Sequence, residues 1–433
     1  MYRVNSNGVG TGAEARQPPA DRVDLPELDL PYDLVVDLVM RRCFLDHTTS
    51  ISRLTGALAL PAQVIESVFQ DLRARKFLDV EGLLGQDYVF CLTAAGREQA
   101  RERFERSRYA SVAPVPLAAY HERVLAQRAQ PRIDHDDVRR AFADLVLPDR
   151  LVNQIGAAFT AQESMFIYGP SGTGKTAIAE RLGRLHRDGV LIPRAVEVDG
   201  QIVTVFDPTM HRELEPQPDG LDPRWVACHR PVVTVGGELD LDMLQLRHDP
   251  ASGTYLAPLQ MRANNGILFI DDFGRQLVSP QALLNRWIVP LDRRVDHLAL
   301  QHGQKFVIPF EPLVVFSTNL DPADLNEDAF FRRIQAKIYV GPISEEVFDW
   351  IVSRSVQRHG LSTTKSDIVH LRAVCRHHGG GRLLGCYPED FCRLAAAICR
   401  FANRPSLLNQ ETIDEVSALY FATADADGPP LNG

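Results

Sequence analysis

Several features that mark membrane, secreted and metal-binding proteins are missing from this sequence. It has no run of about 18 apolar residues and no hydrophobic signal core at its polar N-terminus, so we expect no membrane insertion. The seven cysteines include no CxxC pair, which predicts reduced thiols in a cytoplasmic protein. His377 and His378 lie near Cys386, Cys392 and Cys399, but their spacing fits no usual zinc pattern, and we expect no metal site there.

An excess of basic residues is also missing. The 433 residues carry a formal net charge of −9, which argues against a general nucleic-acid-binding coat and leaves only a local basic face open. A chain of this length is sufficient for about three domains with buried cores.

What the sequence does contain is a glycine-rich loop between an apolar run and a helical pattern. Met165 to Tyr168 is followed by Gly-Pro-Ser-Gly-Thr-Gly-Lys-Thr, the G-x-x-x-x-G-K-[ST] pattern of a phosphate-binding loop. Glycine tolerates the positive φ angles that turn backbone N–H groups toward an anion, and the following helix adds positive potential. The predicted phosphate-binding residues are Gly169, Pro170, Ser171, Gly172, Thr173, Gly174, Lys175 and Thr176. Lys175 is expected to reach the β and γ phosphates, and the Thr176 hydroxyl to ligate Mg²⁺.

A second signature is an apolar run that ends in two carboxylates. Gly266 to Ile270 has the composition of a parallel strand buried on both faces, and Asp271 and Asp272 follow at the end where α/β sheets bind ligands. The segment resembles a Walker B strand. This resemblance implies that Asp271 holds Mg²⁺, directly or through water, and that Asp272 orients and polarises the attacking water.

A third strand, Leu313 to Phe316, is followed by Ser317, Thr318 and Asn319. With the three segments in this order, the chain resembles the AAA+ ATPases, and Asn319 takes the place of their sensor-1 residue. The hairpin predicted within Arg293 to Phe310, and the Ala-Asn-Asn-Gly sequence before the Walker B strand, resemble the MoxR and magnesium-chelatase branch. The resemblance implies ATP and Mg²⁺ as cofactors. Asp272 departs from the family's usual glutamate by one methylene.

The resemblance extends to the arginines that complete such sites. Asp328 to Ile334 resembles the segment carrying the arginine finger, which enters the neighbouring subunit's site, and either Arg332 or Arg333 is the candidate. In the chelatase-like branch an arginine, sensor 2, follows the proline that here is Pro388. Glu389 stands at that position, which leaves Arg382, Arg393 or no residue in this role.

The N-terminal part has a different pattern. Helices are expected over Asp33 to Phe44, Thr49 to Ala57 and from Pro61 onward, then strands over Phe77 to Val80 and Tyr88 to Leu92, then a helix capped by Thr93. This order resembles a winged-helix domain. Its predicted wing carries acidic residues and no Lys or Arg, which favours protein docking and leaves DNA binding as the alternative.

We therefore predict an α/β P-loop NTPase of the AAA+ type with a parallel sheet core, an α-helical lid and a winged-helix domain. The predicted divisions are a disordered leader (1–24), the winged-helix domain (25–110), a linker (111–136), the ATPase core (137–342), the lid (343–424) and a flexible tail (425–433).

The function predicted from these motifs is ATP hydrolysis that remodels a protein client in an oligomeric ring, with a hexamer favoured. Two alternatives remain open at this stage. One is a DNA-bound regulator that selects sites through its winged helix, and the other is a nucleotide-dependent scaffold with little turnover.

Overall fold

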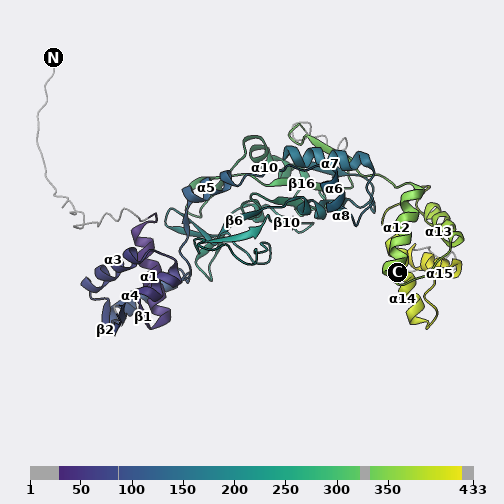
Figure 1. Ribbon diagram of the computed structural model, residues 1–433. Coiled ribbons are helices and arrows are strands. Elements are labelled where there is room, and N and C mark those ends of the chain that lie inside the picture. The colour runs from purple at the N-terminus through teal and green to yellow at the C-terminus, as the bar shows by residue number, and fades with distance from the viewer. Residues whose placement is uncertain (1–28, 86, 322–331, 422–433) are drawn as a thin grey trace, which may run out of the picture.

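The structure is a computed structural model that describes residues 29–85, 87–321 and 332–421. Figure 1 shows three parts in a row, with an N-terminal helical domain at one end, an α/β core in the middle and a group of helices at the other end. The predicted leader (1–24) and tail (425–433) lie outside the described residues.

The N-terminal domain contains the predicted helices and hairpin, with one additional strand. Its elements are α1 (Tyr32–Asp46), β1 (Thr48–Ser50), α2 (Ile51–Leu58), α3 (Ala62–Ala74), β2 (Leu78–Leu84), β3 (Asp87–Leu92) and α4 (Ala94–Arg106). The antiparallel sheet has the order β1-β3-β2. Thr93 accepts a hydrogen bond from the Gly96 N–H and caps α4 as predicted. The expectation that the second helix begins at Thr49 was wrong, because Thr49 pairs with Phe90 in the sheet and Ser50 caps α2.

The core is a parallel sheet whose strand order differs from the chain order. Its strands are β5 (Met165–Tyr168), β10 (Val232–Val235), β13 (Ile267–Ile270), β16 (Leu313–Thr318) and β17 (Ala336–Tyr339). They lie side by side as β10-β13-β16-β5-β17, and all neighbours are parallel. The three strands predicted from the motifs are therefore adjacent at the centre, and their carboxyl ends meet at one edge.

Helices cover both faces of this sheet. One face packs on α6 (His135–Ala141), α7 (Asp149–Ala161), α8 (Lys175–Arg181) and η1 (Leu182–Leu185). The other face packs on α9 (Leu259–Arg262) and α10 (Pro280–Arg293). Side chains alternate along β13, so that Phe269 belongs to the first layer and Leu268 to the second. Burial on both faces explains the almost continuous apolar sequence of this strand.

A β-rich unit lies between the core and the N-terminal domain. It contains β4 (Val115–Pro116), α5 (Leu117–Ala126), β6 (Gly189–Pro193), β7 (Ala195–Val198), β8 (Gln201–Thr204), β9 (Trp225–His229), β11 (Arg247–Asp249), β12 (Thr254–Leu256), β14 (Val295–Ala299) and β15 (Lys305–Pro309). The short helix η2 (Asp242–Leu244) packs with the core instead, because Leu244 belongs to the second layer. One sheet has the order β11-β12-β8-β7-β4, and β6 pairs with β9. The predicted turn at Asp199 and Gly200 is present, with φ angles of 51° and 75°.

The C-terminal region is helical, as predicted. It contains α12 (Glu345–Arg358), α13 (Lys365–His378), α14 (Tyr387–Phe401) and α15 (Gln410–Tyr420), which bury a common apolar core. Capping side chains begin three of these helices: Ser344 for α12, Thr364 for α13 and Asn409 for α15.

Further sequence-based expectations concern membranes, thiols and metals. None of the helices in the described parts of the chain has the length and apolar character to cross a membrane. All seven cysteines lie in these parts and are free thiols. The same residues contain no cluster of three or more metal-ligating side chains, so His377 and His378 form no such group with the nearby thiols.

Candidate phosphate-binding site

The glycine-rich loop lies at the carboxyl edge of the sheet, between β5 and α8. Gly169, Gly172 and Gly174 have φ angles of 143°, 76° and 96°, which are the positive angles predicted from the motif. Two of these positions also leave no room for a side chain. A Cβ at Gly169 would lie 2.2 Å from the carbonyl oxygen of Val340, and one at Gly172 would lie 2.6 Å from Sγ of Cys386.

Lys175 is the first residue of α8 and is 6 % exposed. Its ammonium donates to the carbonyl oxygens of Gly169 and Pro170, each at 2.9 Å, and to Oδ1 of Asn319 at 2.6 Å. Burial lowers the pKa of Lys175, while the nearby carboxylates of Asp272 and Asp271 act in the opposite direction. All three N–H donors of this side chain are therefore directed at oxygen acceptors around the loop.

Thr176 and Asp271 form the second contact across the site. The Thr176 hydroxyl lies 3.1 and 3.0 Å from the two carboxylate oxygens of Asp271. Oxygen ligands of this kind, a hydroxyl and a carboxylate, are what Mg²⁺ prefers in proteins, and it usually uses one or two carboxylates together with substrate phosphates. The residues at this position fit a magnesium ion bound together with a nucleotide.

Asp272 follows Asp271 on the same exposed turn and has a φ angle of 47°. Its backbone N–H donates to Oδ1 of Asp271 at 3.0 Å. Asn319 comes directly after β16, and its amide oxygen meets the Lys175 ammonium. The structure thus places side chains from the β5, β13 and β16 ends around one point, as the sequence predicted, while their catalytic roles stay predictions.

The C-terminal helices contact the loop directly. The Cys386 N–H, just before α14, donates to the carbonyl oxygen of Gly172 at 3.0 Å, and Leu384 lies beside the same glycine. A second contact joins the C-terminal helices to the core: the Arg354 guanidinium of α12 donates to the carbonyl oxygen of Ala143, which follows α6, at 2.8 Å. Nothing in the sequence motifs indicated that Cys386 would adjoin Gly172.

The residue at the position expected for sensor 2 has its partners on α12 and directly after it. Glu389 accepts hydrogen bonds from the Ser355 hydroxyl at 2.6 Å, from Nε2 of His359 at 2.9 Å and from the Arg358 guanidinium at 3.2 Å. Burial acts to raise the pKa of Glu389, but these bonds outweigh it and the pKa is lowered. Glu389 therefore joins α14 to α12. Of the two arginines considered as substitutes, Arg393 pairs with Asp390, and exposed Arg382 lies two residues before Leu384.

The two arginine-finger candidates differ in their surroundings. Arg332 is exposed, whereas Arg333 is partly buried and forms an ion pair of 3.6 Å with Asp292 of α10. The segment immediately before them, including Phe330 and Phe331, lies outside the described residues.

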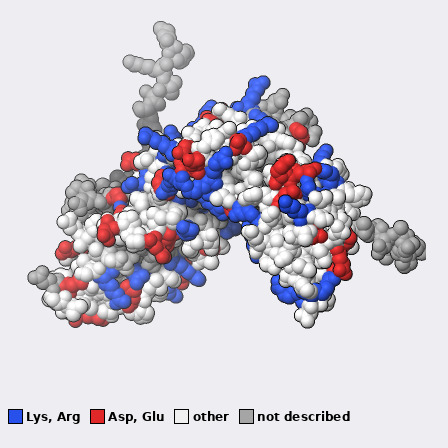
Figure 2. Space-filling model, turned by 45° about the vertical axis from the view of Figure 1, so that its right-hand side comes forward, with Lys and Arg blue, Asp and Glu red and all other residues white. Residues whose placement is uncertain are grey.

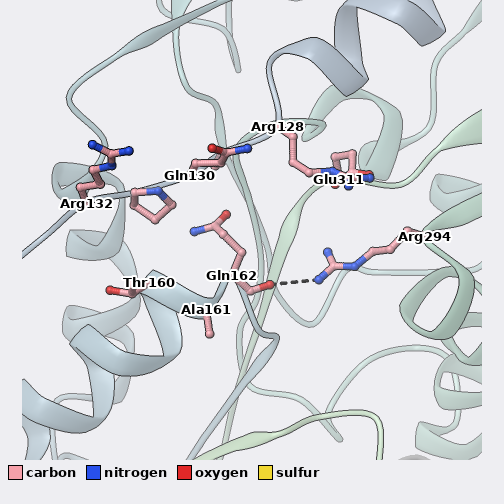
Figure 3. Close-up of a pocket in the computed structure, with 10 residues that line it drawn as sticks. Arg128, Gln130, Arg132, Thr160, Ala161, Gln162, Arg294 and Glu311 are labelled. Atoms are coloured by element: carbon pink, nitrogen blue, oxygen red, sulfur yellow. Dashed lines mark hydrogen bonds and ion pairs between the residues drawn. The ribbon is translucent and has the colours of Figure 1, made fainter.

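Two cavities lie at the opposite, amino end of the central strands. The larger has a volume of about 410 Å³ and contacts the segment between α5 and α6 together with the ends of α7 and α10. Figure 3 shows Arg294 directed at the Gln162 carbonyl oxygen, with Arg128 beside Glu311. Both guanidiniums thus have partners within the chain, and the cavity is separate from the glycine-rich loop.

Three side chains have structural roles that the sequence did not indicate. Asn264 donates to the Tyr120 hydroxyl at 2.7 Å and to the Pro309 carbonyl oxygen at 3.0 Å, and Asn265 donates to the Val124 carbonyl oxygen at 2.9 Å. The Asn-Asn pair thereby fixes α5 to the start of β13. The third, Gln276, bonds to the backbone of the Asp271–Asp272 turn, and no pattern in the sequence indicates this.

Strand order, the phosphate-binding loop and the polar residues at three adjacent strand ends agree with one fold class. The core is an α/β fold with a parallel sheet and a phosphate-binding type of loop after β5, followed by a helical C-terminal region, as predicted.

Comparisons with known proteins add the following. Residues 344–418 match a family described as a domain of unknown function (DUF8689), and no curated protein matches the chain. The structure is similar to the RuvB Holliday junction branch migration motor of Thermotoga maritima, with 13 % identity, a TM-score of 0.36 and coverage of 68 % of this chain and 72 % of that one. It is also similar to NtrX of Brucella abortus in complex with ATP, with 14 % identity, a TM-score of 0.41 and coverage of 76 % and 63 %. For NtrX in complex with ADP the identity is 14 % and the TM-score 0.41, with coverage of 67 % of this chain and 60 % of that one.

Proposed function

We propose that this protein binds ATP together with Mg²⁺ at the glycine-rich loop and hydrolyses it. The observation that carries the proposal is the connected set of hydrogen bonds at the carboxyl edge of the sheet. Lys175 bonds to Asn319, and Thr176 bonds to Asp271, so that the ends of β5, β16 and β13 converge. Such convergence of a phosphate loop with carboxylate and amide side chains serves phosphoryl transfer, where catalysis is mainly positioning and charge stabilisation.

Each residue has a distinct part in this reaction. The Lys175 ammonium exchanges its carbonyl and amide acceptors for phosphate oxygens, and loop N–H groups bind the same anion. Thr176 and Asp271 hold Mg²⁺, which neutralises phosphate charge when bound. Asp272 accepts a hydrogen bond from the attacking water and orients it. Asn319 positions the water from the β16 side.

Nucleotide titration of the purified chain tests this proposal. We expect a fluorescent ATP analogue to bind and a phosphate-release assay to detect turnover, both weakened when EDTA removes Mg²⁺. A chain that is folded by circular dichroism and binds no nucleotide with Mg²⁺ present would contradict it.

We propose further that the active form is a homo-oligomeric ring, with a hexamer favoured, that remodels a protein client. A site that needs an arginine in trans is incomplete in one subunit, and exposed Arg332 is available to a neighbour. Arg333 is the weaker candidate because it already pairs with Asp292.

The N-terminal domain is proposed to be a winged helix that docks protein. In its wing, formed by β2 and β3, Leu83 and Leu84 are 64 % and 75 % exposed, and Asp79 and Glu81 are exposed beside them. Apolar and acidic side chains of this kind suit a protein surface and repel DNA phosphates. On the molecular face in Figure 2, Lys and Arg are interspersed with Asp and Glu. Salt-dependent binding of duplex DNA by the full chain would favour the regulator alternative instead.

The scaffold alternative has one observation in its favour. Glu389 supplies no cation at the sensor-2 position, because its side chain is a carboxylate, and this carboxylate is bonded to Ser355 of α12 and to His359 directly after it. Tight ATP binding with turnover at the background rate would identify a scaffold, and measurable phosphate release would argue against it.

A further inference from the structure

The Gln276 side chain closes the turn that carries the two aspartates. Its Nε2 donates to the carbonyl oxygens of Asp271 at 2.9 Å and Asp272 at 3.2 Å. Its Oε1 accepts the Gly274 N–H at 2.7 Å. One amide thus bonds to three backbone groups on both sides of Asp272, and it uses both donor hydrogens and its acceptor.

The backbone beside Asp272 is fixed to neighbouring strands as well. The Asp271 N–H donates to the Val235 carbonyl oxygen at 2.8 Å, and the Phe273 N–H donates to the Ser317 carbonyl oxygen at 2.7 Å. The Thr318 hydroxyl donates to the Phe273 carbonyl oxygen at 2.6 Å. These bonds hold the residues on either side, so the direction of the Asp272 side chain depends on the backbone angles of Asp272 itself.

Those angles are unusual for a residue with a side chain. Asp272 has a φ of 47°, which is the left-handed region. Asp and Asn enter this region far more readily than other non-glycine residues, because their short polar side chains bond locally. Glutamate has no comparable preference. The shorter carboxylate and the left-handed backbone are therefore compatible features of one turn. The Arg275 N–H donates to the Asp272 carbonyl oxygen at 3.0 Å, and Gln276 adds hydrogen bonds on both sides of Asp272.

We propose that Gln276 is a positioning residue, which holds Asp272 in the left-handed conformation and thereby aims its carboxylate at the attacking water. The inference rests on the proposed ATP hydrolysis and concerns the same site. The side-chain hydrogen bonds of Gln276 go to backbone atoms of the turn, so we place its effect in the position of Asp272.

The test is steady-state ATP hydrolysis by the full-length Gln276→Ala variant. A misplaced catalytic group can cost up to roughly 100-fold in rate, so we expect kcat to fall about 10- to 100-fold. KM and the affinity for a fluorescent ADP should stay within about twofold, since Lys175 and Thr176 are untouched. Leu277→Ala is the matched control, because this adjacent side chain is 80 % exposed, and it should keep the wild-type kcat.

A double-mutant cycle separates positioning from general damage to the loop. In the Asp272→Asn background the carboxylate is already lost, so adding Gln276→Ala should lower the residual rate by less than twofold. A wild-type kcat in Gln276→Ala would overturn the inference, as would equal losses of kcat and ADP affinity, or a full further loss in the double variant. If the wild type binds ATP without turnover, the proposed function fails instead, which is a separate outcome.

Discussion

The Lys175 ammonium lies 2.6 Å from Oδ1 of Asn319 and joins the start of α8 to the end of β16. Because the same ammonium also bonds to the carbonyl oxygens of Gly169 and Pro170, all its donors are occupied within the chain. A bound phosphate has to replace at least one of these acceptors. Where the replaced acceptor is Asn319, its amide oxygen becomes available to a water molecule, so that the two residues change partners together.

Lys175→Ala should abolish ATP binding and leave the fold intact. The variant loses charge-assisted hydrogen bonds to phosphate, each with a net value of roughly 1.5–3 kcal/mol, so the affinity should fall by about 100-fold or more. The loop's shape depends on glycine φ angles rather than on this side chain. Nucleotide titration checks the first part and thermal unfolding the second. Unaltered affinity would disprove the assignment of the phosphate-binding loop.

Asp272→Asn should separate binding from hydrolysis. Asp271 and Thr176 keep the Mg²⁺ ligands, and asparagine tolerates the φ of 47° that this position requires. ATP should therefore bind with near-wild-type affinity and persist uncleaved, with kcat reduced at least about 100-fold. The measurement is phosphate release at saturating ATP. Turnover at the wild-type rate would assign the water-orienting role to another residue.

The sequence was sufficient to predict that these polar residues lie close together, because each motif couples a strand to polar residues at its end. The runs Met165 to Tyr168 and Ile267 to Ile270 are buried strands, and the residues after them meet at one edge of the sheet. β17 was not predicted, because Ala336 to Tyr339 is short and becomes a strand only through its pairing with β5. Contacts such as Cys386 with Gly172 depend on how distant segments pack, which no local pattern encodes.

Removing residues 1–108 should leave basal ATPase activity and abolish client recruitment. The structure adds a cost in stability that the sequence did not indicate. Ala195 and Ile202 of the β-rich unit belong to the apolar core of the N-terminal domain, and the Ser107 hydroxyl bonds to the Ser252 carbonyl oxygen at 3.2 Å. We therefore expect activity at low temperature together with a Tm lowered by a few degrees. Deletion of residues 1–28 is the control, and it should change neither the basal ATPase activity nor the Tm. Loss of basal activity in a folded deletion variant would contradict the prediction.

Asp144 gives a pH-dependent contribution to stability. Hydrogen bonds from Arg181, at 2.9 Å, and Arg184, at 2.8 Å, hold the pKa of its carboxyl well below the usual range. A carboxyl group whose pKa is lower in the folded state stabilises the folded protein at pH values above the pKa of the unfolded chain, about 3.9. This stabilisation is lost as the pH falls below that value.

Asp144→Asn should therefore lower the free energy of unfolding at pH 7 by about 1 kcal/mol, a modest value because the pair is partly solvent-screened. The difference from wild type should shrink as the pH falls below about 4, as measured by urea unfolding at several pH values. Asp149→Asn is the control, since Asp149 and Arg139 form a well-exposed pair and little change is expected. A difference that is constant with pH would show that the carboxylate charge is not responsible.

Assembly can be tested by mixing two inactive variants. If Arg332 completes the neighbour's site, a Lys175→Ala subunit can donate its arginine to the intact loop of an Arg332→Ala subunit. Arginine fingers contribute roughly 10³–10⁵-fold in rate, so even a few mixed interfaces should exceed the activity of either parent. Arg333→Ala is the comparison: because Arg333 pairs with Asp292 within its own chain, we expect reduced stability rather than rescue of this kind.

The same hypothesis predicts that the specific activity of the wild type rises with protein concentration until the ring forms. The assembled mass measured by light scattering and the specific activity should rise with the same midpoint concentration, because the completed site exists only between subunits. Concentration-independent activity, with no rescue on mixing despite demonstrated co-assembly, would mean that Arg332 acts within one chain or only at the surface. Only the arginine that enters the neighbour's site can be supplied in trans. If Lys175→Ala subunits restored activity when mixed with Arg333→Ala subunits but not with Arg332→Ala subunits, Arg333 would be the arginine finger.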